Sequence, residues 1–240
     1  MKYGILGDIH ANIEALEAVL EEMGNEGVEE YVSVGDIVDY GANPSECIAK
    51  IREIGATVVA GNHDLAVIGL LNVDFFNNYA KASAEWTRNV MNDGEKNFIA
   101  NLKLVEKMDN FTVVHSTLNS PELFEYVLTS YDAHLNFDKQ TTPVCFIGHS
   151  HIPVNFIKRK NVSYNMDAEI RLETDMQALV NVGSVGQPRD DNPQAVCVIY
   201  DSDEGVVRLN RVKYNVDGAM KKILDAGLPP MLAERLKYGR

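Results

Sequence analysis

Cysteine is scarce in this chain. Its 240 residues include three cysteines that are widely separated and lack any Cys-x-x-Cys spacing, namely Cys47, Cys145 and Cys197. This pattern argues against a disulfide framework and against a zinc ribbon. We expect three buried thiols that pack as small apolar side chains.

Long apolar runs are also missing. The first apolar run reaches the carboxylate of Asp8 too early for the hydrophobic region of a signal peptide. No later stretch approaches the roughly 18 apolar residues that a membrane span needs. The sequence therefore predicts a cytoplasmic protein with no membrane partner.

Basic residues are outnumbered by acidic ones. Lysine and arginine total 22 against 35 aspartates and glutamates, and the formal net charge is -13. A surface of this sign repels polyanions, so we do not expect a nucleic-acid partner. Small phosphorylated ligands are not excluded, because bound cations can reverse the potential inside one cleft.

The chain has enough apolar material for one substantial core. Hydrophobic residues make up 45% of the sequence and charged residues 24%, a balance typical of a globular domain. The sequence shows no internal repeat, low-complexity tract or clear linker. We expect residues 1–240 to form a single domain.

Strands and helices alternate over residues 2–60. Apolar runs at 2–7, 31–34 and 57–60 predict strands, and apolar periodicity predicts helices at 13–23 and 44–54. Asn43 is a candidate cap for the second helix, and Glu46 would complete a capping box. This βαβαβ pattern places the carboxyl ends of parallel strands at one edge, where open α/β sheets bind ligands.

The rest of the chain is mixed. Residues 65–104 are predicted to be helical, with one stripe formed by Tyr79, Trp86 and Val90. The apolar stretch 65–71 has a second interpretation, as a cleft wall or an oligomer contact. Further strands are predicted at 111–114, 144–147, 154–157, 178–182, 195–200 and 206–211, and terminal helices at 217–226 and 230–237.

Side chains that can bind metals stand at the ends of predicted strands. Five of the six histidines belong to this set, together with aspartates and an asparagine. Side chains alternate along a strand, so residues two apart, such as Asp8 and His10 or His149 and His151, reach the same centre. Imidazole mixed with carboxylate suits Mn, Fe, Zn, Ni or Co, whereas Ca and Mg prefer oxygen ligands alone. The set is too large for one tetrahedral zinc, but two metals sharing a carboxylate would use it all.

These motifs resemble those of the calcineurin-like metallophosphoesterase superfamily. All five family motifs occur in order between residues 8 and 151, and residues 181–189 extend the likeness to its small bacterial and archaeal phosphodiesterase-like branch. Each motif alone is weak evidence, whereas the ordered set is specific. The motifs are Asp8-x-His10, Gly35-Asp36-x-x-Asp39, Gly61-Asn62-His63-Asp64, His115 and Gly148-His149-Ser150-His151.

The resemblance implies a site for two divalent transition-metal ions. Asp8, His10 and His151 would hold one metal, Asn62, His115 and His149 would hold the other, and Asp36 would bridge them. His63 would stand just outside the metals, with Asp39 as the hydrogen-bond partner that orients its ring. The implied fold is α/β, a four-layer αββα sandwich of two mixed β-sheets flanked by helices. The strand pattern alone does not distinguish this fold from a single wound sheet.

The resemblance also implies a reaction. A metal-bridging hydroxide would attack a phosphomonoester or phosphodiester in line with the leaving oxygen, because paired metals activate a shared water and bind phosphate oxygens. His63 is the candidate general acid, since a carboxylate partner favours its charged form. The alternative is a histidine that only hydrogen-bonds phosphate. We expect a small phosphorylated substrate, with a nucleotide among the options.

Several residues are candidates for binding that substrate. Asn62 and His63 are expected to contact it, and Arg189 would either clamp a phosphate oxygen or form a surface salt bridge. Asn12 would either cap the first helix or touch the substrate, and capping is favoured.

Residues 116–143 are the segment that we expect to line the substrate pocket. Four of its side chains would either stack on a base or simply pack around a short helix: Phe124, Tyr126, Tyr131 and His134.

The chain also departs from family patterns. Tyr40 stands where Ser/Thr protein phosphatases of this superfamily carry an arginine, so a protein phosphatase is disfavoured. Val182 and Ser150 replace a proline and a threonine that are common in the bacterial branch. A different class of function remains open, a metal-stabilised scaffold that binds partner proteins without catalysis. His63 favours the enzyme, because scaffolds of this superfamily commonly lose that histidine.

Overall fold

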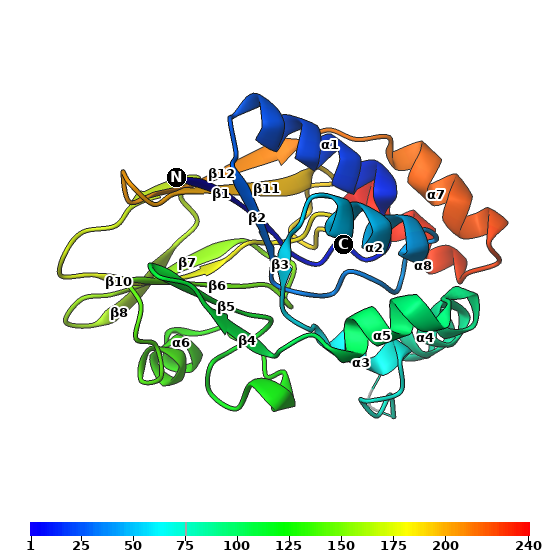
Figure 1. Ribbon diagram of the computed structural model, residues 1–240, viewed down its shortest axis with the longest axis horizontal. Helices are drawn as coiled ribbons and strands as arrows, with labels where there is room; N and C mark the ends of the chain where they lie inside the picture. Colours follow the sequence, from blue (N-terminus) through cyan, green and yellow to red (C-terminus); the bar gives the residue numbers. More distant parts are fainter. Residues whose placement is uncertain (75) are drawn as a thin grey trace.

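Two β-sheets lie face to face in the structure, and helices cover their outer faces (Figure 1). The computed structural model describes residues 1–74 and 76–240. Each sheet combines parallel and antiparallel strands. The order of layers is helix, sheet, sheet, helix, which confirms the predicted αββα sandwich.

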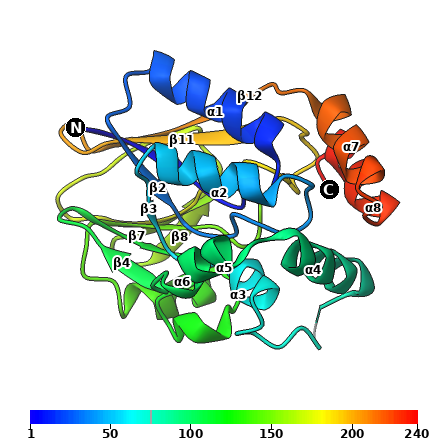
Figure 2. The ribbon, with the colours of Figure 1, turned by 45° about the vertical axis from the view of Figure 1, so that its right-hand side comes forward.

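The first sheet contains the predicted βαβαβ unit. Its parallel strands β3, β2 and β1 are neighbours, and β11, β12 and β9 extend the sheet by antiparallel pairing. Helices α1 (Ile13–Asn25) and α2 (Pro44–Glu53) connect the parallel strands and lie over this sheet (Figure 2). In sheet order the strands are β3 (Thr57–Val58), β2 (Glu30–Ser33), β1 (Lys2–Leu6), β11 (Ala195–Asp201), β12 (Val206–Val212) and β9 (Glu169–Arg171).

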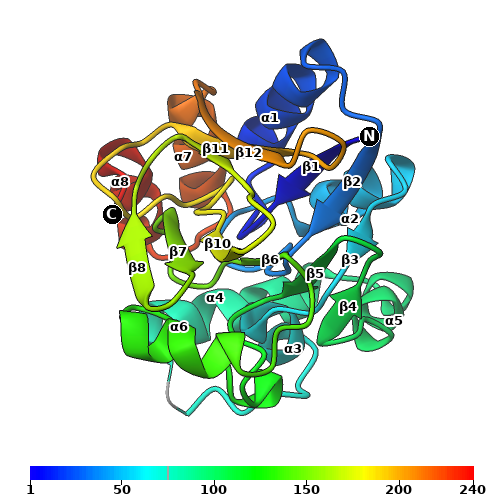
Figure 3. The same ribbon diagram turned by 90° about the vertical axis from the view of Figure 1, so that its left-hand side faces the viewer.

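The second sheet has parallel strands β5, β6 and β10 at its centre and antiparallel strands at its edges. Helix α6 (Ser130–Phe137) lies on its outer face (Figure 3). In sheet order the strands are β4 (Val105–Lys107), β5 (Phe111–Val114), β6 (Val144–Ile147), β10 (Gln177–Asn181), β7 (Val154–Lys158) and β8 (Val162–Asn165).

Alternating side chains explain why the layers stack. In β6, Val144 and Phe146 point into the core between the sheets, whereas Cys145 and Ile147 pack on the α6 side. Strand β11 divides its side chains in the same way between the inter-sheet core and α1. Strands buried on both faces read as continuous apolar runs, which is why these strands were predictable. The three cysteines are buried free thiols, as expected.

The remaining helices lie at the end of the molecule where β1 and β2 terminate (Figure 1). Helices α7 and α8 pack on each other and, with α4, bury the ring of Tyr40. Their bounds are α3 (Asn62–Val67), α4 (Asn78–Val90), α5 (Asp93–Ala100), α7 (Val216–Asp225) and α8 (Pro230–Tyr238). A short 3-10 helix, η1 (Pro121–Leu123), lies between β5 and α6 in the chain. None of the helices within the described ranges is long and apolar enough for a membrane crossing.

The prediction for residues 65–104 was wrong in detail. Among the described residues of this range, which leave out Phe75, three helices are present. The predicted stripe of α4 is not its buried face, since Tyr79 and Val90 are 48% and 47% exposed. The face that is buried carries small side chains, namely Ala80, Ser83, Ala84 and Thr87. Small residues allow α4 to approach its neighbours closely, and a pattern search for large apolar residues overlooks such a face.

One predicted helix cap is present and another is not. The Asn12 side chain accepts the N–H of Ala15 at 3.1 Å, so it caps α1 as expected. Asn43 makes no such bond to the backbone, and its amide NH2 group donates to the carboxylate of Glu46 at 2.8 Å. The predicted capping box of α2 is therefore absent, although both residues lie at the start of that helix.

Three strands were not predicted from the sequence. They are β4, β8 and β9, which have three, four and three residues and are largely half-buried or exposed. Such short edge strands carry little apolar alternation, so they give a weak signal.

Candidate metal centre

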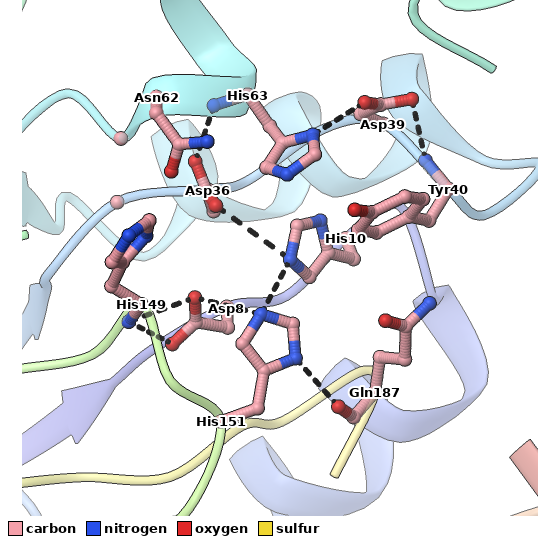
Figure 4. Close-up of polar contacts among 12 residues, drawn as sticks. Asp8, His10, Asp36, Asp39, Tyr40, Asn62, His63, His149, His151 and Gln187 are labelled. Carbon is pink, nitrogen blue, oxygen red and sulfur yellow. Dashed lines mark hydrogen bonds and ion pairs between the residues drawn. The ribbon is translucent and has the colours of Figure 1, made fainter. Parts of the chain in front are cut away.

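The predicted metal ligands gather where the ends of the two sheets meet (Figure 4). Asp8, Asp36 and Asn62 follow β1, β2 and β3 of the first sheet. The histidine ligands of the second sheet come from the ends of β5 and β6. All these side chains are buried, with at most 8% of their surface exposed. The site therefore depends on both sheets.

The backbone at these strand ends adopts left-handed conformations. Asp8, His10, Asp36, His149 and His151 have φ angles of 50°, 48°, 53°, 68° and 61°. Such conformations are uncommon for non-glycine residues and cost on the order of 1–3 kcal/mol each. They persist only where the surroundings hold them, and they cluster at functional sites.

Two glycines allow the site segments to approach closely. A Cβ at Gly61 would collide with the carboxylate and the backbone nitrogen of Asp36. A Cβ at Gly148 would collide with the carboxylate of Asp8. Glycine is needed at both positions because no side chain fits.

The first predicted set of ligands is compact. Asp8, His10, Asp36 and His151 each offer a ligand atom, and these atoms all lie within 4.8 Å of one another. The Nε2 atom of His151 lies 3.1 Å from His10 Nε2 and 3.2 Å from Asp8 Oδ1. Among the His, Cys, Asp and Glu residues of the described chain, no other group of three or more is so compact.

Backbone carbonyls determine which nitrogens of this set can bind a cation. The Nδ1–H groups of His10 and His151 donate to the carbonyls of Val38 and Gln187 at 3.2 and 2.7 Å. Because a carbonyl only accepts, each Nε2 of the neutral rings carries a lone pair. Burial lowers the pKa of both imidazoles, so both are neutral near pH 7. The two facing lone pairs repel each other unless a cation lies between them.

The second predicted set is joined through His115. Its Nε2 lies 3.1 Å from Asn62 Oδ1 and 3.2 Å from His149 Nδ1, and its Nδ1 donates to the Val34 carbonyl at 2.8 Å. Burial lowers the pKa of His149. Burial acts in the same direction on His115, but the neighbouring Asp36 carboxylate outweighs it and raises the pKa of His115 to about 9. Without a metal, His115 is therefore protonated on both ring nitrogens and positively charged near pH 7.

Asp36 lies between the two sets. Its Oδ1 accepts the backbone N–H of His63 at 2.9 Å. Its Oδ2 lies 3.6 Å from His10 Nε2 and 3.3 Å from His115 Nε2, and it forms no well-aligned hydrogen bond with the residues that the structure describes. A buried carboxylate oxygen in this state is costly unless a cation accompanies it, and without a metal the protonated His115 is that cation. The donor set therefore fits divalent metal ions.

His63 lies beside the ligands and does not belong to either set. Its Nδ1 donates to Asp39 Oδ2 at 2.6 Å, which is the hydrogen bond that the resemblance implies. Tyr40 and Phe76 pack against its ring with centroid distances of 4.5 and 4.7 Å. Burial alone would lower the pKa of His63, but Asp36 and Asp39 raise it above its ordinary value. With Nδ1 engaged, Nε2 is the nitrogen that can face a ligand (Figure 4).

Asp64 holds this site together, and this role was not predicted from the sequence. Its carboxylate ties the loop after β2 to the start of α3. The signal was available, since an acid in the third position of a helix often bonds back to the backbone before that helix. It accepts the backbone N–H groups of Asp36, Ile37, Val38 and Gly61 at 2.8, 2.9, 3.2 and 3.0 Å.

Arg189 lies near the first set of ligands. Its guanidinium donates to Gln187 Oε1 at 2.8 Å and lies 5.8 Å from the centre of the Tyr40 ring. Burial is the main cause of the lowered pKa of His151, and the charge of Arg189 adds to it. In the described part of the chain, the hydrogen bonds of its side chain are to Gln187 and not to a carboxylate.

Two of the four aromatic candidates in residues 116–143 reach the site. The ring of Tyr126 stacks on His149 with centroids 4.0 Å apart and planes inclined by 26°, and its side chain is half exposed. Phe124 is buried, and its ring centre lies 5.9 Å from that of His115, a predicted ligand of the second set, with the planes inclined by 67°. Tyr131 and His134 instead lie on the exposed side of α6.

The chain matches one family of known proteins along most of its length. A model described as the calcineurin-like phosphoesterase superfamily domain matches residues 1–205. An uncharacterized protein of Methanocaldococcus jannaschii, MJ0912, is 38% identical over 241 residues, which cover 98% of this chain and 97% of that protein.

Solved structures show the same architecture. A metallophosphoesterase from Sphaerobacter thermophilus is 35% identical with a TM-score of 0.89, covering 100% of this chain and 99% of its own. The protein PH1004 from Pyrococcus horikoshii has a TM-score of 0.81 at 18% identity, covering 100% of this chain and 98% of its own, and that likeness concerns the fold alone.

Proposed function

The chain belongs to the calcineurin-like phosphoesterase superfamily and is a metal-dependent phosphoesterase, and we propose that it uses two divalent metal ions to hydrolyse small phosphomonoesters or phosphodiesters. The metals would come from the group Mn, Fe, Zn, Ni and Co, because the donors mix imidazole, carboxylate and amide. In-line attack of hydroxide on phosphorus would expel the leaving alcohol.

The position of Asp36 Oδ2 is the observation that carries the proposal. It lies 3.6 Å from His10 Nε2 and 3.3 Å from His115 Nε2, and these nitrogens belong to different ligand sets. A single carboxylate oxygen placed in this way can be shared by two cations. Asp8 and His151 would complete one site. Asn62 and His149 would complete the other.

The residues around the ligands would divide the remaining work. When bound, the two metal ions would supply Lewis acidity that activates water and stabilises the charge developing on phosphate oxygens. His63 would give the proton on its Nε2 to the leaving oxygen, and Asp39 would hold that ring through Nδ1. Arg189 carries donors that suit phosphate oxygens, and its contact with the neutral Gln187 leaves the charge available.

The non-catalytic scaffold is the weaker alternative for this site. A scaffold would need the ligands but not a histidine that offers one nitrogen toward the centre while a buried carboxylate holds the other. The ordered His63–Asp39 pair therefore favours catalysis.

Tyr126 exposes half of its surface beside His149, so a flat leaving group such as a nucleobase is one option. We keep phosphomonoesters, phosphodiesters and nucleotides as candidates that a substrate panel would separate.

The test is hydrolysis of p-nitrophenyl phosphate and bis-p-nitrophenyl phosphate by protein loaded with Mn(II) or Ni(II), with metal content measured on the same sample. We expect two metals per chain and turnover of at least one ester. Asp36→Asn should lose metal and turnover together, whereas Asp138→Asn, an exposed control on the C-terminal side of α6, should keep both. Absence of turnover at full metal loading would instead support the scaffold.

A further inference from the structure

Ser83 of helix α4 lies directly against Asp39. The Ser83 side chain is fully buried, and its hydroxyl donates to Asp39 Oδ1. The Ser83 oxygen also accepts the backbone N–H of Tyr40 at 2.8 Å. A single hydroxyl thus contacts both residues of the short turn that presents Asp39.

The two oxygens of Asp39 have separate partners. Oδ2 accepts Nδ1–H of His63 at 2.6 Å. Oδ1 accepts the hydroxyl of Ser83 and the backbone N–H of Tyr40, the latter at 2.8 Å. With Oδ1 held from two directions, the carboxylate plane cannot turn without losing hydrogen bonds, and this keeps Oδ2 on the His63 ring.

The turn at Asp39 needs this support. Asp39 and Tyr40 both have left-handed backbone conformations, with φ angles of 74° and 64°. Two consecutive non-glycine residues in this region are strained and persist only where neighbouring groups hold them. The backbone N–H of Tyr40, shared between Asp39 and Ser83, is one such restraint.

Helix α4 also contacts the other half of the His63–Asp39 pair. Arg88, on the same helix, donates to the carbonyls of Ala66 and Val67 at 2.7 and 2.6 Å. These carbonyls end α3, the helix that carries His63 in its first turn. Phe76, just before α4, packs against the His63 ring. The α4 region therefore holds both Asp39 and the helix of His63.

We propose that Ser83 is a positioning residue for the proton transfer by His63. The inference rests on the proposed function, in which Nε2–H of His63 gives its proton to the leaving oxygen as the P–O bond breaks, and the neutral ring then regains a proton from water. Asp39 keeps its hydrogen bond to Nδ1 of His63 throughout, and Ser83 keeps the Asp39 carboxylate aligned. Ser83 has no direct role at the substrate or the metals.

The dependence of kcat on the basicity of the leaving group tests this role specifically. A weakly basic leaving group such as p-nitrophenolate departs with little protonation, whereas phenolate or an alkoxide needs the proton. General acid catalysis typically contributes about 10²- to 10⁴-fold. Ser83→Ala should therefore lower kcat by roughly 10-fold on phenyl or alkyl esters, part of the general-acid contribution, and change it little on p-nitrophenyl esters.

The experiment measures kcat over a series of esters of increasing leaving-group basicity, with the metal content of each variant determined. Ser83→Thr keeps the hydroxyl and should restore the wild-type dependence. Thr87→Val is the matched control, because Thr87 is buried on the same face of α4 and its hydroxyl has no partner among the described residues. It should behave as wild type.

Two outcomes distinguish a failure of the general-acid role of His63 from a failure of the positioning role of Ser83. His63→Ala, run in parallel, must steepen the dependence on leaving-group basicity; if it does not, the general-acid role in the proposed function is wrong. If His63→Ala steepens this dependence but Ser83→Ala lowers kcat equally for all esters, or for none, the positioning role of Ser83 is overturned. Should Ser83→Ala fold poorly, Ser83→Cys keeps the volume with a weaker donor, and an intermediate slope is expected; an unchanged slope contradicts the proposal.

Discussion

The Nε2 atoms of His10 and His151 lie 3.1 Å apart, although both rings donate through Nδ1 and are neutral when buried. Two acceptors at this distance repel each other, and Asp8 and Asp36 add carboxylate oxygens to the same group. Without a cation, this group therefore places several lone-pair acceptors close together inside the protein. A bound cation removes that repulsion, so metal binding and folding stability should be linked.

Metal binding should stabilise the protein against heat. A ligand that binds only the native state adds about 2.7 kcal/mol at a concentration 100 times its Kd, which corresponds to a Tm rise of roughly 5–10 °C for a chain of this length. Thermal unfolding followed by circular dichroism, with EDTA and then with excess Mn(II), measures the difference. Equal Tm values with and without metal, at confirmed occupancy, would contradict the linkage.

Metal affinity should rise with pH below about 9. Burial works to lower the pKa of His115, but Asp36 raises it to about 9, so the metal-free protein holds a proton on His115 that the metal must displace. One displaced proton makes the apparent affinity rise up to about 10-fold per pH unit below this pKa and level off above it. Calorimetric titrations at several pH values, in buffers with different ionisation enthalpies, count the released protons. Affinity independent of pH between 6.5 and 9 would be inconsistent with the His115–Asp36 contact.

His63→Ala should lower turnover while both metals stay bound. His63 is held by Asp39 and is not a member of either ligand set, so its loss removes the proton donor and leaves the donors for metal in place. A fall in kcat of about 10²- to 10⁴-fold is expected on esters with basic leaving groups. Metal analysis on the purified variant is the decisive measurement, because loss of metal would mean that His63 is a ligand. His134→Ala, at an exposed position on α6, is the control.

Asp64→Asn should destabilise the fold. The Asp64 carboxylate accepts four backbone N–H groups, and an asparagine would turn an amide NH2 toward two of them. Buried donors left without acceptors cost about 1–3 kcal/mol each, so two of them should lower the free energy of unfolding by roughly 2–6 kcal/mol. Urea denaturation measures it. Asp132→Asn is the control, since Asp132 occupies the same position in α6 but makes its hydrogen bonds at the protein surface, and an equal loss there would refute the role of burial.

The local features of the site were predictable from the sequence. Strands that bury both faces give continuous apolar runs, so β5 and β6 were predicted with the bounds that the structure has. The polar residue after each run marks a strand end, and alternation along a strand pairs His149 with His151. These signals depend only on neighbours in the chain, and a single sequence contains them.

The face-to-face packing of the two sheets was not determined by the strand pattern and is known only from the tertiary structure. The same strand pattern would suit one wound sheet, and only the face-to-face arrangement brings His115 of the second sheet to Asp36 of the first, and His149 to Asp8. The role proposed for Ser83 was not predictable from the sequence either, because a serine on a helix face of small residues gives no apolar pattern. That role depends on the hydrogen bond from Ser83 to Asp39, which lies 44 positions away in the chain. A sequence pattern fixes side-chain identity and local direction, whereas contacts between distant segments depend on the free energy of the whole packed core.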